Sequence, residues 1–127
     1  MKKRNKDESS FRDPSGYIFY ESKEIYRKIN KSYFEEYNNL MKSGLYDELV
    51  EKKLLIEHQE IERTDDYIII KPEKIPFISY PYEWCFEQFR DAALLTLKIN
   101  KIALEYGMIL KDASVYNVQF INGNPIF

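Results

Sequence analysis

The pattern of hydrophobic and polar positions divides the chain into a first half with short strand-like runs and a second half built on one long helix. Residues 17–20 and 25–29 are rich in aromatic and β-branched residues and flank the polar tetrapeptide Glu21-Ser22-Lys23-Glu24. This arrangement predicts a β-hairpin with a four-residue loop. Further strands are expected over 54–62 and 67–70, and the second of these is a continuous apolar run typical of a buried strand.

Two short helices are expected between these pairs of strands. Ser32 is followed three residues later by Glu35, a capping-box pattern that marks the start of a helix. Gly44 lies where a C-terminal cap would end that helix, and a second helix is expected over 45–53. Apolar residues recur on one face of each helix, so each is predicted to pack one side against a core.

The longest predicted helix runs from about residue 86 to 106 and ends at Gly107. It is apolar over most of its surface, and a helix of this kind is typically central in a fold. We therefore expect it to be buried centrally. The segment 71–84 before it is predicted to be an extended connector, because three prolines fall within ten residues: Pro72, Pro76 and Pro81.

The end of the chain carries the strongest turn signal. Residues 116–121 form a strand-like run, and Asn122-Gly123 is the preferred dipeptide of a two-residue hairpin turn. The return strand has only begun at Phe127, and a hairpin needs both strands to be stable. We therefore interpret the chain as the front part of a longer polypeptide. The complete pattern predicts an α+β fold with a β-rich N-terminal half, a long buried helix and a C-terminal β-hairpin.

Length and charge narrow the class of protein. The chain has 127 residues, enough for a single domain, which is expected over 11–127 after a disordered tail at 1–10. The net charge of −2 offers no basic excess for nucleic acid or an anionic membrane, and no apolar run approaches the roughly 20 residues that span a bilayer. The single cysteine, Cys85, cannot form an internal disulfide, which fits a cytoplasmic location.

The composition is unusual in its aromatic content of 16%, with 11 Tyr and 8 Phe. Tyrosine buries its ring and keeps its hydroxyl in water, so this content suits a half-exposed surface. A homo-oligomer formed through exposed surface is a further expectation. The alternative interpretation is a coding bias, since Lys, Asn and Ile are also plentiful.

Asp112 and Asn117 lie five residues apart, between the long helix and the terminal hairpin. This order resembles protein kinases and aminoglycoside phosphotransferases, in which a loop aspartate takes the substrate hydroxyl proton and an asparagine five residues later helps to hold magnesium. The resemblance implies catalysis by Asp112 and metal binding by Asn117, although the glycine-rich loop of kinases is missing. Alternatively, Asp112 and Ser114 cap a turn and Asn117 bonds the backbone.

Four stretches carry a longer resemblance that covers nearly the whole chain: FRDPSGYIFY (11–20), YRKINKSYFEEYNNLMKSGLYDELV (26–50), KPEKIPFISYPYEW (71–84) and DAALLTLKINKIALEYGMILKDASVYNVQFINGNPIF (91–127). They are similar to the region that precedes the catalytic domain in a family of prokaryotic class I SAM-dependent methyltransferases. The resemblance implies an N-terminal accessory domain for substrate binding or docking. Its partner would be the downstream methyltransferase domain of its own chain, with S-adenosylmethionine as the cofactor of the full-length protein.

By itself the chain is expected to bind no cofactor and to be inactive. A class I SAM site needs a glycine-rich turn, because only glycine lets the backbone approach the cofactor closely. The four glycines are scattered along the chain: Gly16, Gly44, Gly107 and Gly123. The alternative function is a piece of a kinase-like phosphotransferase that uses Asp112 and Asn117 with Mg-ATP. A third is a binding module without chemistry.

Several other residues are candidates for a site. Tyr80, Tyr82 and Trp84 form an aromatic group in the connector, which lines the nucleotide cleft in the kinase-like interpretation and is otherwise a hinge packed on the long helix. His58, the only histidine, is interpreted as a surface residue of a strand, because no second metal ligand or catalytic partner is evident. Cys85 is interpreted as a small buried hydrophobic residue.

Overall fold

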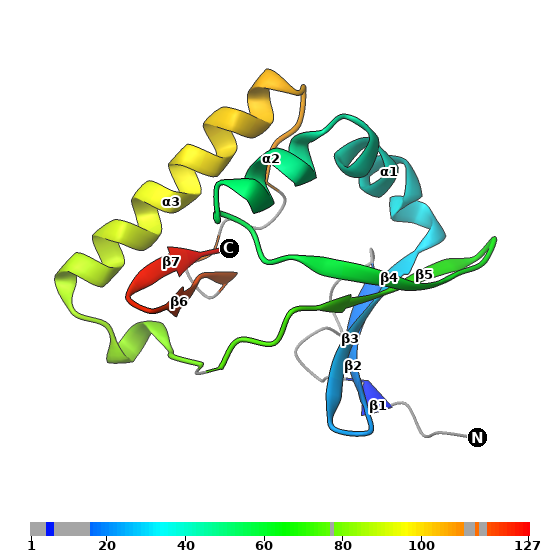
Figure 1. Cartoon of the computed structure of the whole chain (residues 1–127), viewed down its shortest axis with the longest axis horizontal. Coiled ribbons are helices and arrows are strands. Elements are labelled where there is room, and N and C mark those ends of the chain that lie inside the picture. Colours follow the sequence, from blue (N-terminus) through cyan, green and yellow to red (C-terminus); the bar gives the residue numbers. More distant parts are fainter. Residues whose placement is uncertain (1–4, 7–15, 77, 111–113, 115–116) are drawn as a thin grey trace. The chain divides into compact units, whose positions relative to one another are not determined.

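The computed structural model describes residues 5–6, 16–76, 78–110, 114 and 117–127. The chain divides into two compact units (Figure 1). The first combines residues 1–39 with 57–74, and the second combines residues 40–56 with 75–127.

The first unit is built on an antiparallel five-stranded sheet in the order β1-β2-β3-β5-β4. The strands are Asn5–Lys6 (β1), Gly16–Glu21 (β2), Glu24–Asn30 (β3), His58–Arg63 (β4) and Tyr67–Pro72 (β5). The prediction of a buried strand over 67–70 is confirmed, because Ile68, Ile69 and Ile70 of β5 are all buried. In the register with β3, Ile29 lies opposite Ile68, so apolar side chains meet across the middle of the sheet.

The turn between β2 and β3 is tighter than predicted. Glu21 pairs with Glu24, which leaves a two-residue loop at Ser22-Lys23 in place of the expected four-residue loop. Both loop residues have left-handed backbones, with φ of 53° and 66°. Positive φ at both central positions is the signature of the type I′ turn, whose twist matches that of the flanking strands. Strand pairing therefore imposes a turn that neither Ser22 nor Lys23 favours by itself.

The predicted short helices are present. A 3-10 turn, η2 (Lys31–Tyr33), leads into α1 (Phe34–Lys42), and α2 spans Leu45–Glu51. Gly44 lies between α1 and α2 with φ of 91°, a conformation that glycine adopts without strain.

The second unit packs its helices and a hairpin around one apolar cluster. Helix α3 spans Phe86–Glu105, and the hairpin pairs β6 (Gln119–Ile121) with β7 (Asn124–Ile126). The predicted Asn122-Gly123 turn is confirmed, with φ of 51° and 80°. The buried cluster consists of Leu45, Leu49, Leu54, Trp84, Ala92, Leu95, Ile99, Ile102, Ala103 and Val118.

The hairpin gains support from residues that were predicted to belong to a different strand. The Phe127 N–H donates to the Leu54 carbonyl at 2.9 Å, and the Ile56 N–H donates to the Phe127 carbonyl at 3.0 Å. The strand expected over 54–62 is therefore observed only from His58, since residues 54–56 pair with the end of the hairpin instead. These bonds satisfy both backbone groups of Phe127, the residue that follows β7.

Helix α3 confirms the predicted long helix but corrects its predicted central burial. Only one face is buried, through Ala92, Leu95, Ile99, Ile102 and Ala103. On other sides, large apolar side chains are exposed, among them Phe86, Leu97 and Leu104. The apolar residues of α3 therefore form two faces. One face packs in the second unit, and this unit leaves the other uncovered. The fold is mixed α+β, and its kinase-like character stays a prediction.

We expect Lys23→Gly to raise the free energy of unfolding by about 0.5–1 kcal/mol, because glycine adopts the left-handed backbone of this turn with less strain than lysine. Urea denaturation followed by circular dichroism measures the change. Lys74→Gly, an exposed site outside the left-handed region, is the control and should not stabilise the chain. Equal gains in both variants would contradict the assignment of strain to the turn.

Candidate functional site

The two residues of the predicted phosphotransfer site stand differently in the structure. Asp112 lies outside the described residues. Asn117 is exposed, and its backbone N–H donates to the Ser114 carbonyl at 3.0 Å, which forms a local turn. Whether the side chains of Asp112 and Asn117 converge therefore stays a prediction.

Trp84, at the end of the connector, is a core residue. Its ring meets Phe89 of α3 and Phe120 of β6 edge-on, with centroid separations of 5.4 and 5.1 Å. Its indole N–H donates to the Ser79 hydroxyl at 2.9 Å, so the one polar atom of this buried side chain is satisfied. Trp84 thus fixes the connector to both α3 and the hairpin.

Gln119 holds the same connector from the hairpin side. Its side-chain amide accepts from the Ser79 N–H at 3.0 Å and donates to the Ser79 carbonyl at 3.1 Å. This pair of bonds imitates a step of a β-ladder and satisfies both backbone groups of Ser79. The segment that presents Tyr80 and Tyr82 is therefore anchored on its N-terminal side.

Tyr80 and Tyr82 form an exposed aromatic pair next to this anchor. Their rings are stacked, with centroids 5.5 Å apart and planes inclined by 2°. Tyr82 is 79% exposed and Tyr80 is also exposed. Stacked and held in place, the pair offers a preordered aromatic surface at little entropic cost to a binding partner.

The larger uncovered surface lies on α3. We call Phe86, Phe89, Ala93, Leu97 and Leu104 the outer face of α3. All five are exposed, with Phe86 at 77% and Leu97 at 66%. Phe86, Ala93, Leu97 and Leu104 follow one another at intervals of seven, four and seven residues, which places them on one side of a helix. That side is opposite the buried residues Leu95 and Ile99.

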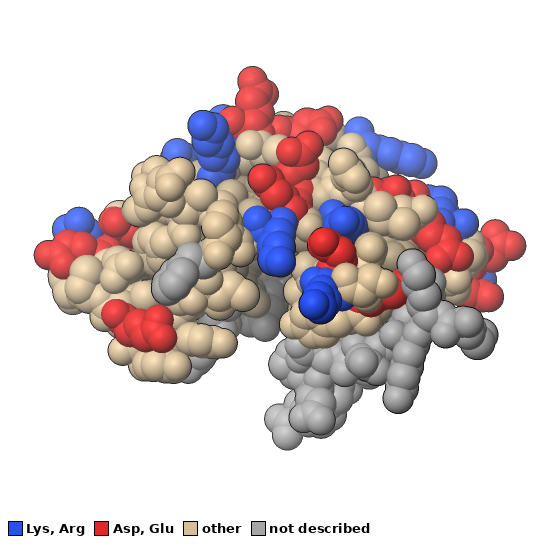
Figure 2. All heavy atoms as spheres, turned by 60° about the horizontal axis from the view of Figure 1, so that its bottom comes forward, with Lys and Arg blue, Asp and Glu red and all other residues tan. Residues whose placement is uncertain are grey.

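The face of the molecule seen in Figure 2 carries charges of both signs. In Figure 2, basic and acidic side chains are interspersed over the visible face, in agreement with a net charge of −2. Large apolar side chains left uncovered on a small protein are typical of an interaction site. The outer face and the tyrosine pair are therefore the strongest candidate for a binding surface in the second unit.

A polar cluster in the first unit joins α1 to β4. The buried Tyr37 hydroxyl lies 3.0 Å from His58 Nε2 and 3.4 Å from Glu60 Oε2. Arg63 Nε donates to Glu60 Oε1 at 2.6 Å, and Arg63 also donates to the Asn38 side-chain oxygen. These contacts tie the side chain of the only histidine to a helix, so its geometry fits a structural role.

The same cluster shifts the titration of two groups. Burial lowers the pKa of His58 below the usual 6.5, and the carboxylates of Glu60 and Glu57 oppose this only in part. The hydrogen bond from Arg63 lowers the pKa of Glu60. In the part of the chain that the structure describes, no group of three or more His, Cys, Asp or Glu side chains is placed to hold a metal ion.

Cys85 departs from its predicted burial. It is exposed and forms the N-cap of α3, where its backbone N–H donates to Gln88 Oε1 at 3.0 Å. An N-cap residue lies outside the helical turn, so the first core position of α3 falls later, at Ala92. The capping-box spacing from Cys85 to Gln88, with cysteine at the N-cap and glutamine three residues later, was the available sequence signal for this arrangement.

We expect the free energy of unfolding to fall as the pH drops below about 6.5, because the unfolded chain then binds a proton at His58 more tightly than the folded chain does. His58→Gln cannot take up this proton, so it should lose less stability between pH 7 and pH 5 than the parent chain. Urea denaturation at both pH values measures the difference. An equal loss in both proteins would refute the role given to His58, the only histidine of the chain.

Comparison with known proteins gives one curated relative. The chain is 30% identical over 125 residues to the nodulation protein NoeA of Rhizobium meliloti (strain 1021). The match covers 93% of this chain but 26% of NoeA, so the chain spans about a quarter of the length of that relative. No family model matches the chain, and no solved structure does. The chain thus resembles one part of a larger protein.

Among the described helices, none is long and apolar enough to cross a membrane.

Proposed function

We propose that this chain is an accessory domain that docks onto a SAM-dependent methyltransferase domain of the same polypeptide. The observation that carries the proposal is the outer face of α3, an apolar surface opposite the face that packs in the second unit. A helix that is apolar on two faces is suited to lie between two partners. The second unit covers one of these faces.

The expected gain from covering the outer face is large enough to support docking. Removing a Leu or Phe side chain from water stabilises a complex by about 1.5–3 kcal/mol. Phe86, Leu97 and Leu104 are each more than half exposed in the chain. Together they offer several kcal/mol toward the entropic cost of association, and that cost is lower when the partner is tethered to the same chain.

Two sequence findings support the identity of the partner. The four matched stretches are similar to the region before the catalytic domain of class I SAM-dependent methyltransferases. The match to about a quarter of NoeA fits a unit that works within a longer protein. The comparison with NoeA supports only the inference that this chain forms part of a longer protein.

Docking explains the surface better than substrate binding. A single helix face is convex and cannot enclose a small molecule, whereas ligand sites are concave. The tyrosine pair Tyr80 and Tyr82 comes directly before α3 in the chain and adds an aromatic surface of the kind enriched in protein interfaces.

The chain by itself should not bind S-adenosylmethionine, because it lacks the glycine-rich turn that admits this cofactor. Isothermal titration calorimetry of the 127-residue chain is the test, and we expect no saturable heat. A class I methyltransferase of known SAM affinity, titrated in the same buffer, is the positive control. Micromolar binding with a stoichiometry of one would refute the assignment of the cofactor site to another domain.

The docking surface predicts a specific protection pattern. The coding sequence should continue past Phe127 into a glycine-rich strand–turn–helix, and this longer polypeptide should shield the outer face of α3. Hydroxyl-radical footprinting compares oxidation of Phe86, Leu97 and Leu104 in the 127-residue chain and in the longer polypeptide. We expect oxidation of these side chains to be strongly reduced in the longer polypeptide.

Leu97→Glu in the longer polypeptide should restore oxidation at Phe86 and Leu104, because it buries a carboxylate in the docking contact. Glu105→Lys changes the charge at an exposed site of the same helix that lies off the outer face, so it is the matched control. A coding sequence without a methyltransferase domain, or equal oxidation in both proteins, would contradict the proposal.

A further inference from the structure

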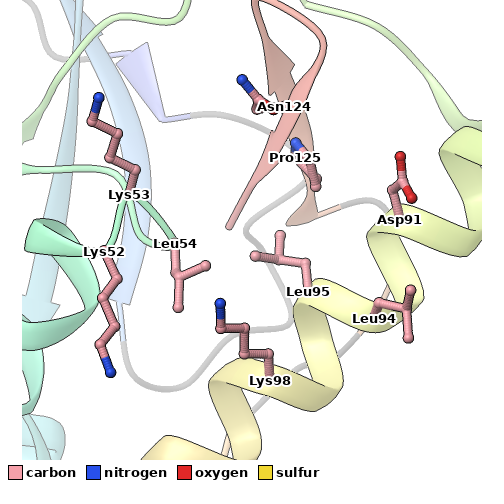
Figure 3. Close-up of a pocket in the computed structure, with 9 residues that line it drawn as sticks. All are labelled: Lys52, Lys53, Leu54, Asp91, Leu94, Leu95, Lys98, Asn124 and Pro125. Atoms are coloured by element: carbon pink, nitrogen blue, oxygen red, sulfur yellow. The ribbon is translucent and has the colours of Figure 1, made fainter.

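A pocket of about 470 Å³ opens within the second unit, between α3, strand β7 and the residues that follow α2 (Figure 3). Its volume is in the range of sites that hold small molecules. It lies on a flank of α3, apart from the outer face, so its contents are a separate question from docking.

The base of the pocket is apolar and firmly held. Leu54 and Leu95 are both buried, and Figure 3 shows their side chains pointing toward one another across the pocket. Leu54 is fixed by its own N–H, which donates to the Leu49 carbonyl at 2.9 Å, and by its carbonyl, which accepts from Phe127. The base therefore exists before any ligand arrives, which lowers the cost of binding.

Of the four charged residues that line the pocket, two have an ion-pair partner within the described part of the chain, and two do not. Lys52 is paired with Glu48 at 3.2 Å, and Asp91 lies 3.8 Å from Arg90. Lys53 and Lys98 also line the pocket, and neither has an ion-pair partner among the residues that the structure describes. In Figure 3 the ammonium of Lys98 lies beside the gap between the two leucines, whereas the side chain of Lys53 points away from them and from Lys98.

Lys53 occupies a strained backbone position. Its N–H bonds the Val50 carbonyl while the Leu54 N–H bonds Leu49, the two bonds of a Schellman motif at the end of α2. Lysine stands at the position that glycine usually fills, with φ of 58°. Lys52 already supplies a positive charge to this helix end. Glycine at this position would relieve the strain and leave the charge that Lys52 gives to this helix end.

We propose that this pocket binds a small organic anion, with an apolar body on Leu54 and Leu95 and its negative charge beside Lys98. A lysine ammonium is a compact charge and lacks the planar, two-pronged donor geometry of the arginine guanidinium. It therefore binds a carboxylate or a phosphate monoester equally well. The apolar base requires a hydrocarbon or aromatic body in either case. The site goes beyond the proposed docking function and does not depend on it.

Titration of the ¹⁵N-labelled 127-residue chain tests the ligand class with four probes. Hexyl phosphate and hexanoate should shift the amide signals of Leu54, Leu95 and Lys98 saturably, with dissociation constants of about 1 mM. The stronger of the two identifies the preferred anion. Hexanol lacks the charge and inorganic phosphate lacks the apolar body, so neither should saturate these shifts. Equal binding of hexanol, or of inorganic phosphate, would overturn the proposal.

Two pairs of variants separate the pocket from general effects. Lys98→Met keeps the apolar stem and should weaken hexyl phosphate roughly threefold to fivefold, whereas Lys101→Met, on the same helix outside the pocket, should change it less than about twofold. Lys53→Gly should raise stability and leave binding unchanged, because the Lys53 side chain points away from the two leucines and from Lys98. Lys23→Gly gives the same backbone relief in the first unit and should leave binding unchanged. If Lys98→Met binds as the parent chain does, or if the control variants weaken binding equally, the proposal fails.

Discussion

The inner face of α3 is the contact on which the second unit depends. Ala92 and Ile99 are almost completely buried there, and Val118 packs into the same cluster before the hairpin begins. Trp84 reaches this cluster from the connector, and Leu54 reaches it from the end of α2. Because three separate segments converge on one helix face, their positions around α3 are fixed by burial rather than by local turns. The pocket and the exposed tyrosine pair are both consequences of this arrangement.

The sequence predicts best where the governing interaction is local. Asn122-Gly123 specifies its turn because both residues tolerate positive φ, and the apolar run of β5 reads directly as a buried strand. The turn at Ser22-Lys23 escaped prediction because its shape is set by strand pairing, against the preference of the turn residues themselves. The bonds between Phe127 and residues 54–56 join segments about 70 positions apart, and no local pattern encodes them.

The exposure of α3 shows a different limit. Apolar periodicity reports which faces of a helix avoid water, but it does not report which partner covers each face. Phe86 and Leu97 therefore looked like core residues, although the second unit leaves them in solvent. The candidate site has the same character. Trp84 stood beside Tyr80 and Tyr82 in one aromatic group, yet its ring is buried and theirs are exposed, because only Trp84 faces α3 and the hairpin.

The geometry of α3 also links the two proposals. Lys98 lies on the flank between Leu95, which faces the pocket, and Leu97, which belongs to the outer face. A partner docked on the outer face would exclude water from this flank, and the attraction between Lys98 and a bound anion grows as the surrounding water is removed. Docking would then tighten anion binding, and by thermodynamic reciprocity a bound anion would tighten docking by the same factor. If instead the partner supplied its own carboxylate to Lys98, the two would compete, so the sign of this coupling distinguishes a cooperative ligand from a competing one.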